Sequence, residues 1–230
     1  MVSGQKKSSS SHETVWVIGC GQFGRRAVEL LKESVPASNI VVVDSLPVND
    51  LPEDIEIICA DGVEWFAEHF TPDATVHKII PALPLHLAAE WMKRKLLEEH
   101  RIFHSAEIPD KQLHHFPHPI RLSASCVVMS HADFICPPNC PEPEGLCTYT
   151  RQPRPPSLYS LLETTVFGNF TPLIVRSRQF AAGVGGFFPQ DLWHLLERGR
   201  VLPGKPLLIG TACKCHGIVD GLCHTMSHIR

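Results

Sequence analysis

The sequence predicts an α/β fold, with a parallel sheet in the N-terminal half and a cysteine-rich C-terminal half that could extend that sheet. Two observations carry this prediction. From residue 14 to about residue 104, short apolar runs alternate with amphipathic segments, which is typical of parallel strands joined by helical crossovers. Seven of the nine cysteines then fall in the second half, so the two halves differ in composition.

A glycine turn follows the first apolar run. Gly19, Gly21 and Gly24 have the G-x-G-x-x-G spacing. In a dinucleotide-binding fold the first glycine permits the tight turn, the second lets the backbone approach the pyrophosphate, and the third lets helix and strand pack closely. Because the spacing stands between a strand and a helix, it predicts a dinucleotide site that also includes Gln22 and Phe23.

The following segments complete the alternation. The helix after the glycine turn should pack one face on the sheet, with the apolar residues Phe23, Ala27, Leu30 and Leu31. Further strands are predicted at residues 40–43, 55–59 and 76–80, and helices at 63–70 and from residue 84 onward. The order is that of a parallel sheet with a helix after every strand.

Acidic residues end two of these strands. Asp44 lies 25 residues after Gly19, at the tip of the second strand, where a carboxylate accepts hydrogen bonds from the adenosine ribose. No arginine follows it directly to neutralise a 2′-phosphate, which favours NAD and leaves NADP open. Asp61 follows the third strand and joins the predicted cofactor contacts.

On Gly19, Gly21, Gly24 and Asp44, residues 14–100 resemble the Rossmann-type NAD(P)-binding domains, in particular the TrkA-type nucleotide-binding domains of potassium-transport regulation. The resemblance implies a bound dinucleotide but no particular reaction. The similarity to TrkA-type domains implies a regulatory protein that senses the nucleotide. The resemblance covers less than half of the chain.

Composition and segment boundaries suggest how the chain is organised. Residues 1–13 are polar and serine-rich and are expected to be a disordered lead-in, followed by a dinucleotide-binding domain at 14–104 and a cysteine-rich half at 105–230. The boundary falls in a histidine- and proline-rich stretch that we interpret as a solvated loop.

The overall charge and hydropathy exclude several classes of partner. A formal net charge of −3 gives no electrostatic reason to expect nucleic acid. No apolar run approaches the roughly 20 residues that span a bilayer, and no secretory signal precedes the first strand. We therefore expect a cytoplasmic protein, as a homodimer or bound to a regulatory partner.

The cysteines of the second half predict a metal site. Cys136, Cys140 and Cys147 lie in a proline-rich loop, and Cys213 and Cys215 follow the last predicted strand, near residues 206–212. An odd cysteine count without an export signal favours metal or thiol chemistry over disulfides. Soft thiolates suit zinc or an iron–sulfur cluster, and the three loop thiols need a fourth ligand. The alternative is a set of free thiols in a surface loop.

A second glycine-rich segment predicts an anion site. Arg176 and Arg178 alternate along a predicted strand and would share a face. Gly185 and Gly186 then precede a helix at 190–198, an arrangement whose backbone N–H groups can hold an anion. A plain turn with two solvated arginines explains the same pattern.

Two functions remain open on the sequence alone. The first is an NAD(P)-dependent oxidoreductase acting on an unknown small molecule, in which His86, beyond the fourth strand, is the candidate acid or base. The second is a non-catalytic nucleotide sensor in which zinc is structural.

Overall fold

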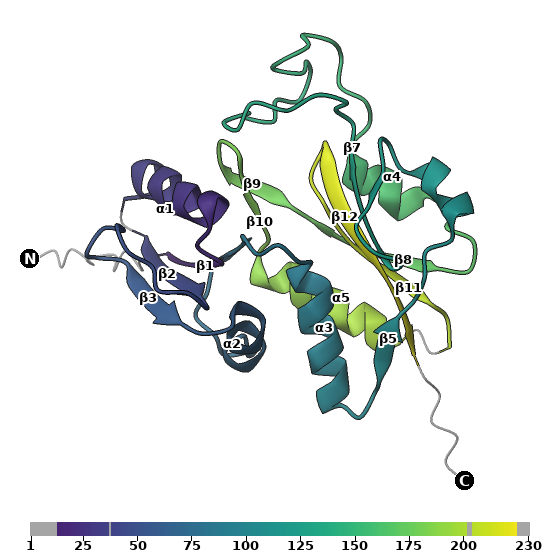
Figure 1. Cartoon of the computed structure of the whole chain (residues 1–230), viewed down its shortest axis with the longest axis horizontal. Coiled ribbons are helices and arrows are strands. Elements are labelled where there is room, and N and C mark those ends of the chain that lie inside the picture. Colours follow the sequence, from purple (N-terminus) through teal and green to yellow (C-terminus); the bar gives the residue numbers. More distant parts are fainter. Residues whose placement is uncertain (1–12, 37, 202–203, 225–230) are drawn as a thin grey trace, which may run out of the picture.

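The computed structural model describes residues 13–36, 38–201 and 204–224. They form two larger β-sheets with helices between them, and a separate two-stranded sheet (Figure 1). Of the predicted disordered lead-in, only Glu13 belongs to the described residues. Residues 1–12 lie outside them.

Sheet A is the parallel sheet of the N-terminal half, and it confirms the predicted α/β class. Its strands are β1 (Thr14–Ile18), β2 (Asn39–Asp44), β3 (Glu56–Cys59) and β4 (Lys78–Pro81), in the order β3-β2-β1-β4. Helices α1 (Gln22–Ser34), α2 (Gly62–His69) and α3 (Leu87–Glu98) follow β1, β3 and β4. In doubly wound sheets of this order, ligands lie beyond the carboxyl ends of the strands.

Alternation along β1 decides which helix covers which face of sheet A. Val15 and Val17 pack with α1, whereas Trp16 and Ile18 pack with α2 and α3 on the other face. Both sets are buried, so β1 is an apolar run, as expected for a parallel strand covered on both sides.

Sheet B is a separate mixed sheet formed by the second half, so this half does not extend sheet A. Its strands are β5 (Phe103–Ser105), β6 (Ile120–Arg121), β7 (Cys126–Ser130), β8 (Thr171–Arg176), β11 (Leu207–Ala212) and β12 (His216–His224). The order is β6-β7-β12-β11-β8, and β5 also pairs with β12. Strands β8 and β11 are parallel, and the other pairs are antiparallel.

The remaining elements cover and join the sheets. Helix α5 (Pro189–Arg200) lies with α3 between them, α4 (Leu158–Thr164) covers the outer face of sheet B, and η1 (Asp110–His115) is a 3₁₀ turn (Figure 1). The hairpin β9 (Arg178–Ala181) and β10 (Val184–Gly186) leads to a bridge between Ile79 and Phe187, with N···O distances of 3.1 and 3.0 Å. Through this bridge the chain after β10 meets the edge strand β4.

An aromatic cluster fills the space between the layers. Trp91 of α3 lies 5.3 Å from Phe70 and 5.2 Å from Trp193 of α5, measured between ring centroids. The cluster continues to Trp16 and Trp65, whose rings are 4.8 Å apart, and Phe66 and Phe70 link the two ends. Both sheets therefore share one core.

In the part of the chain that the structure describes, no helix is both long enough and apolar enough to cross a membrane.

Candidate functional site

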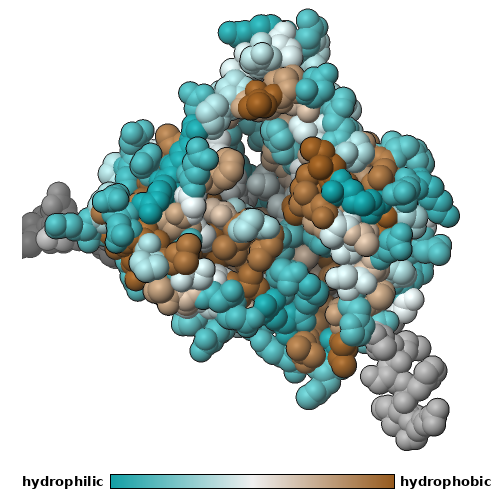
Figure 2. All heavy atoms as spheres, viewed as in Figure 1, coloured by the Kyte–Doolittle hydropathy of each residue, from teal (hydrophilic) through white to brown (hydrophobic). Residues whose placement is uncertain are grey.

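A cavity of about 740 Å³ lies between the start of α1 and the irregular segment that joins β7 to α4. We call residues 131–157 the cysteine loop. Figure 2 shows the molecule hollowed beneath this loop, which projects at the top. The cavity is lined by Phe23 on one side and by the thiols of Cys136, Cys140, Cys147, Cys213 and Cys215 on the other.

Hydrogen bonds between side chains and backbone groups hold the cysteine loop against β9 and against the chain after β11. Gln179 of β9 donates to the carbonyl of Cys140 at 2.7 Å, and the backbone N–H of Lys214 donates to the Glu142 carboxylate at 2.8 Å. Gly183 lets the β9–β10 turn approach the loop, because a Cβ there would lie 1.8 Å from the Pro138 carbonyl oxygen. These contacts bring the loop thiols to the end of β11.

The glycine turn has the geometry that its spacing predicts. Gly19 has φ +99°, and a Cβ on it would lie 2.6 Å from the Ala82 carbonyl oxygen. A Cβ on Gly24 would lie 2.1 Å from the Gly19 oxygen, so both positions exclude side chains for packing reasons. A Cβ on Gly21 would meet no described atom within 4 Å. Helix α1 has no side-chain cap there either, so a ligand could reach its first N–H groups.

The other predicted cofactor contacts divide into two groups. Gln22 and Phe23 are exposed at the start of α1, and Phe23 faces the cavity instead of the predicted core face. Asp44 binds the backbone of the glycine turn. Its carboxylate accepts hydrogen bonds from the N–H of Cys20 at 2.5 Å and from that of Leu46 at 2.9 Å.

Asp61 caps helix α2. One of its oxygens accepts from the N–H groups of Val63 and Glu64, both at 2.9 Å. An acid followed three residues later by glutamate is a recognised start signal for a helix, so the sequence contained this alternative.

The cysteine thiols differ in their electrostatic surroundings. Burial, then the charge of Glu142, raises the pKa of Cys213 to about 12. Burial also raises the pKa of Cys215, against the opposing charge of Arg154, whose guanidinium donates to the Cys215 sulfur at 2.7 Å. Hydrogen bonds from Thr150 lower the pKa of the partly buried Cys147.

Four of the thiols lie within electrostatic reach of one another. The pKa of Cys136 is raised by burial and then by the charges of Cys140 and Cys147, and the charges of Cys136 and Cys147 contribute in the same direction at Cys215. Among the described residues, however, no group of three or more His, Cys, Asp and Glu side chains is close enough to hold a metal ion. All nine cysteines are free.

The two arginines of the predicted anion site are not brought together, because the strand breaks at Ser177. Arg176 stacks on Tyr159 of α4, with 4.5 Å between its Cζ atom and the ring centroid. Arg178 lines the cavity and pairs with Asp191 of α5. Gly185 also lines the cavity, whereas Gly186 packs against Ile79, where a Cβ would lie 2.2 Å from the carbonyl oxygen.

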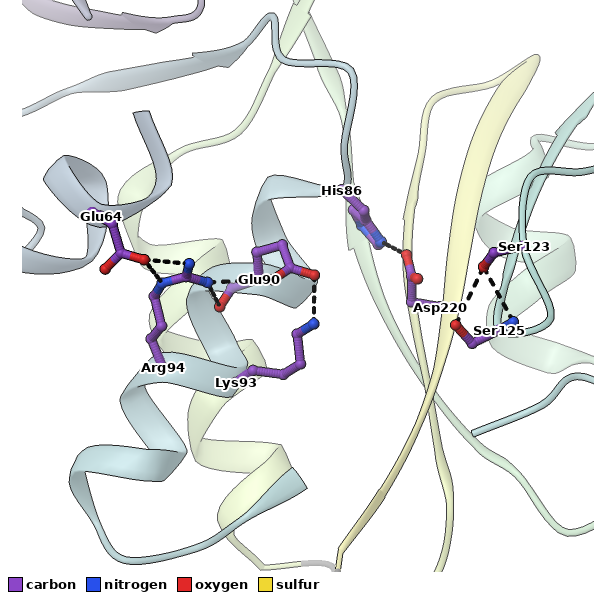
Figure 3. A network of polar contacts seen from close by, with 8 residues as sticks. All are labelled: Glu64, His86, Glu90, Lys93, Arg94, Ser123, Ser125 and Asp220. Atoms are coloured by element: carbon purple, nitrogen blue, oxygen red, sulfur yellow. Dashed lines mark hydrogen bonds and ion pairs between the residues drawn. The ribbon is translucent and has the colours of Figure 1, made fainter. Parts of the chain in front are cut away.

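His86 precedes α3 and lies at a second cavity, of about 470 Å³. Its Nδ1 is 2.8 Å from an Asp220 carboxylate oxygen, and its Nε2 is 2.8 Å from the Thr211 hydroxyl. Figure 3 shows His86 reaching from the α3 end across to Asp220 on β12. Sequence reasoning identified His86 but missed both partners. A carboxylate within the otherwise apolar run of β12 was the available signal.

The family of the chain is decided by its second half. A family model named AF_1314_C and described as "Uncharacterized protein, C-terminal domain" matches residues 88–225. The chain belongs to this family. No curated protein and no solved structure matches it.

This match corrects the resemblance drawn from the sequence. The assignment to the Rossmann-type and TrkA-type families is wrong, because the matching family is AF_1314_C and it lies mainly outside residues 14–100. The glycine spacing and the acid after β2 are requirements of a strand–turn–helix unit, and such local requirements do not establish family membership.

The AF_1314_C match takes in α3, sheet B and the cysteine loop. It therefore includes the five cavity-lining cysteines, Thr211 and Asp220. The glycine turn, Asp44 and His86 precede the matched region.

Proposed function

We propose that the chain is a dinucleotide-binding oxidoreductase whose cofactor lies along the carboxyl edge of sheet A and faces the cysteine-lined cavity. One observation carries the proposal: a single cavity is lined both by Phe23, beside the glycine turn, and by five cysteine thiols. A cofactor held at the turn would lie next to groups capable of redox chemistry.

The glycine turn suits a pyrophosphate. No described atom lies within 4 Å of the position that a Cβ on Gly21 would take, and the first turn of α1 has no side-chain cap. Backbone N–H groups at a helix N-terminus attract anions. The Asp44 carboxylate retains acceptor sites beyond its two backbone partners and would bind the ribose hydroxyls. A bound nicotinamide dinucleotide supplies hydride transfer.

The thiols would supply a metal–thiolate centre, either an iron–sulfur cluster or zinc. All five cysteines line one cavity. We assign Cys136, Cys140, Cys147 and Cys215 to the centre because their charges act on one another, and Cys213 is the neighbouring thiol. The donors suit a soft metal, but their present spacing does not form a coordination set. The cysteine loop would have to draw the sulfurs together before a metal could bind.

Titration calorimetry with NADH and NADPH tests the dinucleotide site. We expect wild-type protein to bind at least one of them, with NADH preferred. Gly21→Ala should weaken binding by about tenfold or more, roughly 1.4 kcal/mol, because its methyl group would occupy the pyrophosphate position. Gly145→Ala is the matched control, since a Cβ there also meets no described atom within 4 Å. Absence of binding, or an unchanged affinity in Gly21→Ala, would contradict the proposal.

Metal analysis of protein purified without oxygen tests the thiol centre. Bound iron with a visible absorption band supports an iron–sulfur cluster, and bound zinc supports the other centre. Cys147→Ser and Cys215→Ser should lose the metal, while Cys59→Ser, at an exposed cysteine of β3, should keep it. Equal metal content in all variants would contradict the assignment.

Turnover separates the oxidoreductase from a non-catalytic sensor. The oxidoreductase should oxidise bound NADH with ferricyanide as an artificial acceptor, whereas a sensor would bind NADH without consuming it.

A cytoplasmic location is part of the proposal, because nine free cysteines suit a reducing compartment. If the protein is a sensor, we propose that it acts as a homodimer or bound to a regulatory partner protein.

A further inference from the structure

The second cavity lies where sheet A meets sheet B. Its wall includes the segment from Pro81 at the end of β4 to Leu87 at the start of α3, and residues of β7, β11 and β12. The same segment packs on the glycine turn, because a Cβ on Gly19 would lie 3.1 Å from Leu83 Cδ2. This cavity is therefore next to the position where the reactive end of a cofactor bound at the turn would lie.

The polar groups of this cavity form a hydrogen-bonded chain. The Asp220 carboxylate only accepts hydrogen bonds when ionised, so Nδ1 of His86 donates to it over 2.8 Å. Nε2 is then the acceptor for the Thr211 hydroxyl, also at 2.8 Å. The His86 and Asp220 side chains are 5% and 17% exposed, so little water competes for these bonds. A hydroxyl, an imidazole and a carboxylate in this order can move a proton.

The rest of the cavity is apolar. Among the described residues that line it, none is Lys, Arg, Asp or Glu, and the polar side chains are those of His86 and Thr211. Leu83, Val128, Phe187 and Ile218 contribute to the apolar wall. A carboxylate or phosphate would find no counter-charge on these walls. The volume of about 470 Å³ suits a small organic molecule.

We infer that this cavity binds the substrate of the proposed oxidoreductase, an uncharged and mainly apolar alcohol or its carbonyl counterpart. The inference rests on the proposed function. In alcohol oxidation, the hydride of the carbinol C–H bond would go to a nicotinamide bound at the glycine turn. The O–H proton passes to Thr211 Oγ1 while the proton of Thr211 passes to His86 Nε2. The substrate becomes a carbonyl, and Asp220 is the positioning residue that holds the imidazolium.

The reverse reaction provides the test. NADH binding is measured first by calorimetry, and NADH consumption is then followed with cyclohexanone and acetophenone as uncharged probes and pyruvate and oxaloacetate as charged ones. We expect reduction of the uncharged ketones. Thr211→Val should lower kcat by about a hundredfold or more while NADH affinity stays unchanged, and Thr211→Ser should restore the rate. Thr164→Val, on the outer helix α4, is the control.

Asp220 is tested by a measurement that a packing defect alone would not reproduce. Asp220→Asn should lower kcat with little change in KM. It should also remove the far-downfield proton resonance of the His86 Nδ1–H, which Thr211→Val should keep. A resonance that persists in Asp220→Asn would contradict the positioning role.

The outcomes separate the two proposals. If no dinucleotide binds, the proposed function and this inference both fail. If NADH binds but neither uncharged ketone is reduced, only the inference fails. It also fails if Thr211→Val turns over like wild type.

Discussion

At the scale of single residues, Cys126 shows how far the influence of Asp220 extends. Burial, followed by the negative charge and the hydrogen bond of Asp220, raises the pKa of Cys126 to about 12. Only the thiolate is nucleophilic. In the folded protein Cys126 should therefore remain protonated and unreactive at neutral pH.

Replacing Asp220 should make Cys126 reactive. In Asp220→Asn the negative charge is lost, the pKa of Cys126 falls, and each unit of that fall gives about ten times more thiolate at a fixed pH well below the pKa. Alkylation by iodoacetamide at mildly alkaline pH, followed by peptide mass spectrometry, measures the rate. Cys59 is exposed and distant in the fold, so its rate should be the same in both proteins. An unchanged rate at Cys126 would show that burial alone protects it.

Residue-level predictions from the sequence succeed where the requirement is local. Gly19 and Gly24 are explained by contacts within one strand–turn–helix unit and its neighbour β4, and their spacing carried that information. The partners of His86 could not be predicted in this way. Asp220 and Thr211 lie 134 and 125 positions away along the chain, and only the register of β11 with β12 brings them to one side chain.

At the scale of secondary-structure elements, the cysteine loop depends on the β9–β10 turn. Gly183 has φ +79°, and a Cβ on it would lie 1.8 Å from the Pro138 carbonyl oxygen. A side chain there would push the two segments apart. The loop would then lose the backbone contacts that present its thiols to the cavity.

Gly183→Ala should loosen the cysteine loop. We expect faster amide hydrogen exchange across residues 136–147, measured by mass spectrometry. Gly204→Ala is the matched control: Gly204 has φ +81°, but a Cβ on it would meet no atom of the described residues within 4 Å, so it should show only the backbone cost of about 1–2 kcal/mol. Equal exchange in the loop of both variants would show that the close approach does not hold it.

The periodicity of the sequence predicts the helices and strands of the first half, but only some of those in the second half. The apolar run from residue 120 to residue 129 does not form one strand: it is split into β6 and β7, because Arg121 holds the Ser123 and Ala124 carbonyls in a turn. Strand β12 was missed. It contains Gly217 and Gly221, which weaken a strand signal, and Gly221 is required because a Cβ there would lie 2.3 Å from the Ala106 oxygen.

At the scale of the whole molecule, the two sheets are joined through one core. Phe187 bridges to Ile79 of sheet A by two backbone hydrogen bonds, and its side chain is buried among residues of both sheets. The chain should therefore unfold as one unit, although its family match begins only at residue 88.

Phe187→Ala should destabilise both sheets together. The expected loss is about 3–5 kcal/mol, the usual cost of truncating a buried phenylalanine. Urea unfolding followed by circular dichroism should show a single transition at a lower midpoint. Val201→Ala, at an exposed position, is the control. Two separate transitions, or protection retained in β1 after β11 has opened to hydrogen exchange, would contradict a shared core.

The arrangement of the two sheets was beyond sequence reasoning. Strand β8 pairs with β11 across the intervening hairpin and α5, and β5 pairs with the last strand. Such pairings depend on tertiary contacts and leave no periodic signal. The glycine turn and the set of cysteines were visible in the sequence as two local patterns, but the cavity lined by both Phe23 and the cysteines was not.

The aromatic cluster between the sheets gives the molecule an optical property. It contains all four tryptophans of the chain, at Trp16, Trp65, Trp91 and Trp193. Tryptophan fluorescence therefore comes entirely from this cluster. A reduced nicotinamide absorbs light where tryptophan emits, so binding at the nearby turn would quench this emission by energy transfer. The tryptophan fluorescence of the unmodified protein would thus report both on the contact between the two sheets and on binding at the glycine turn.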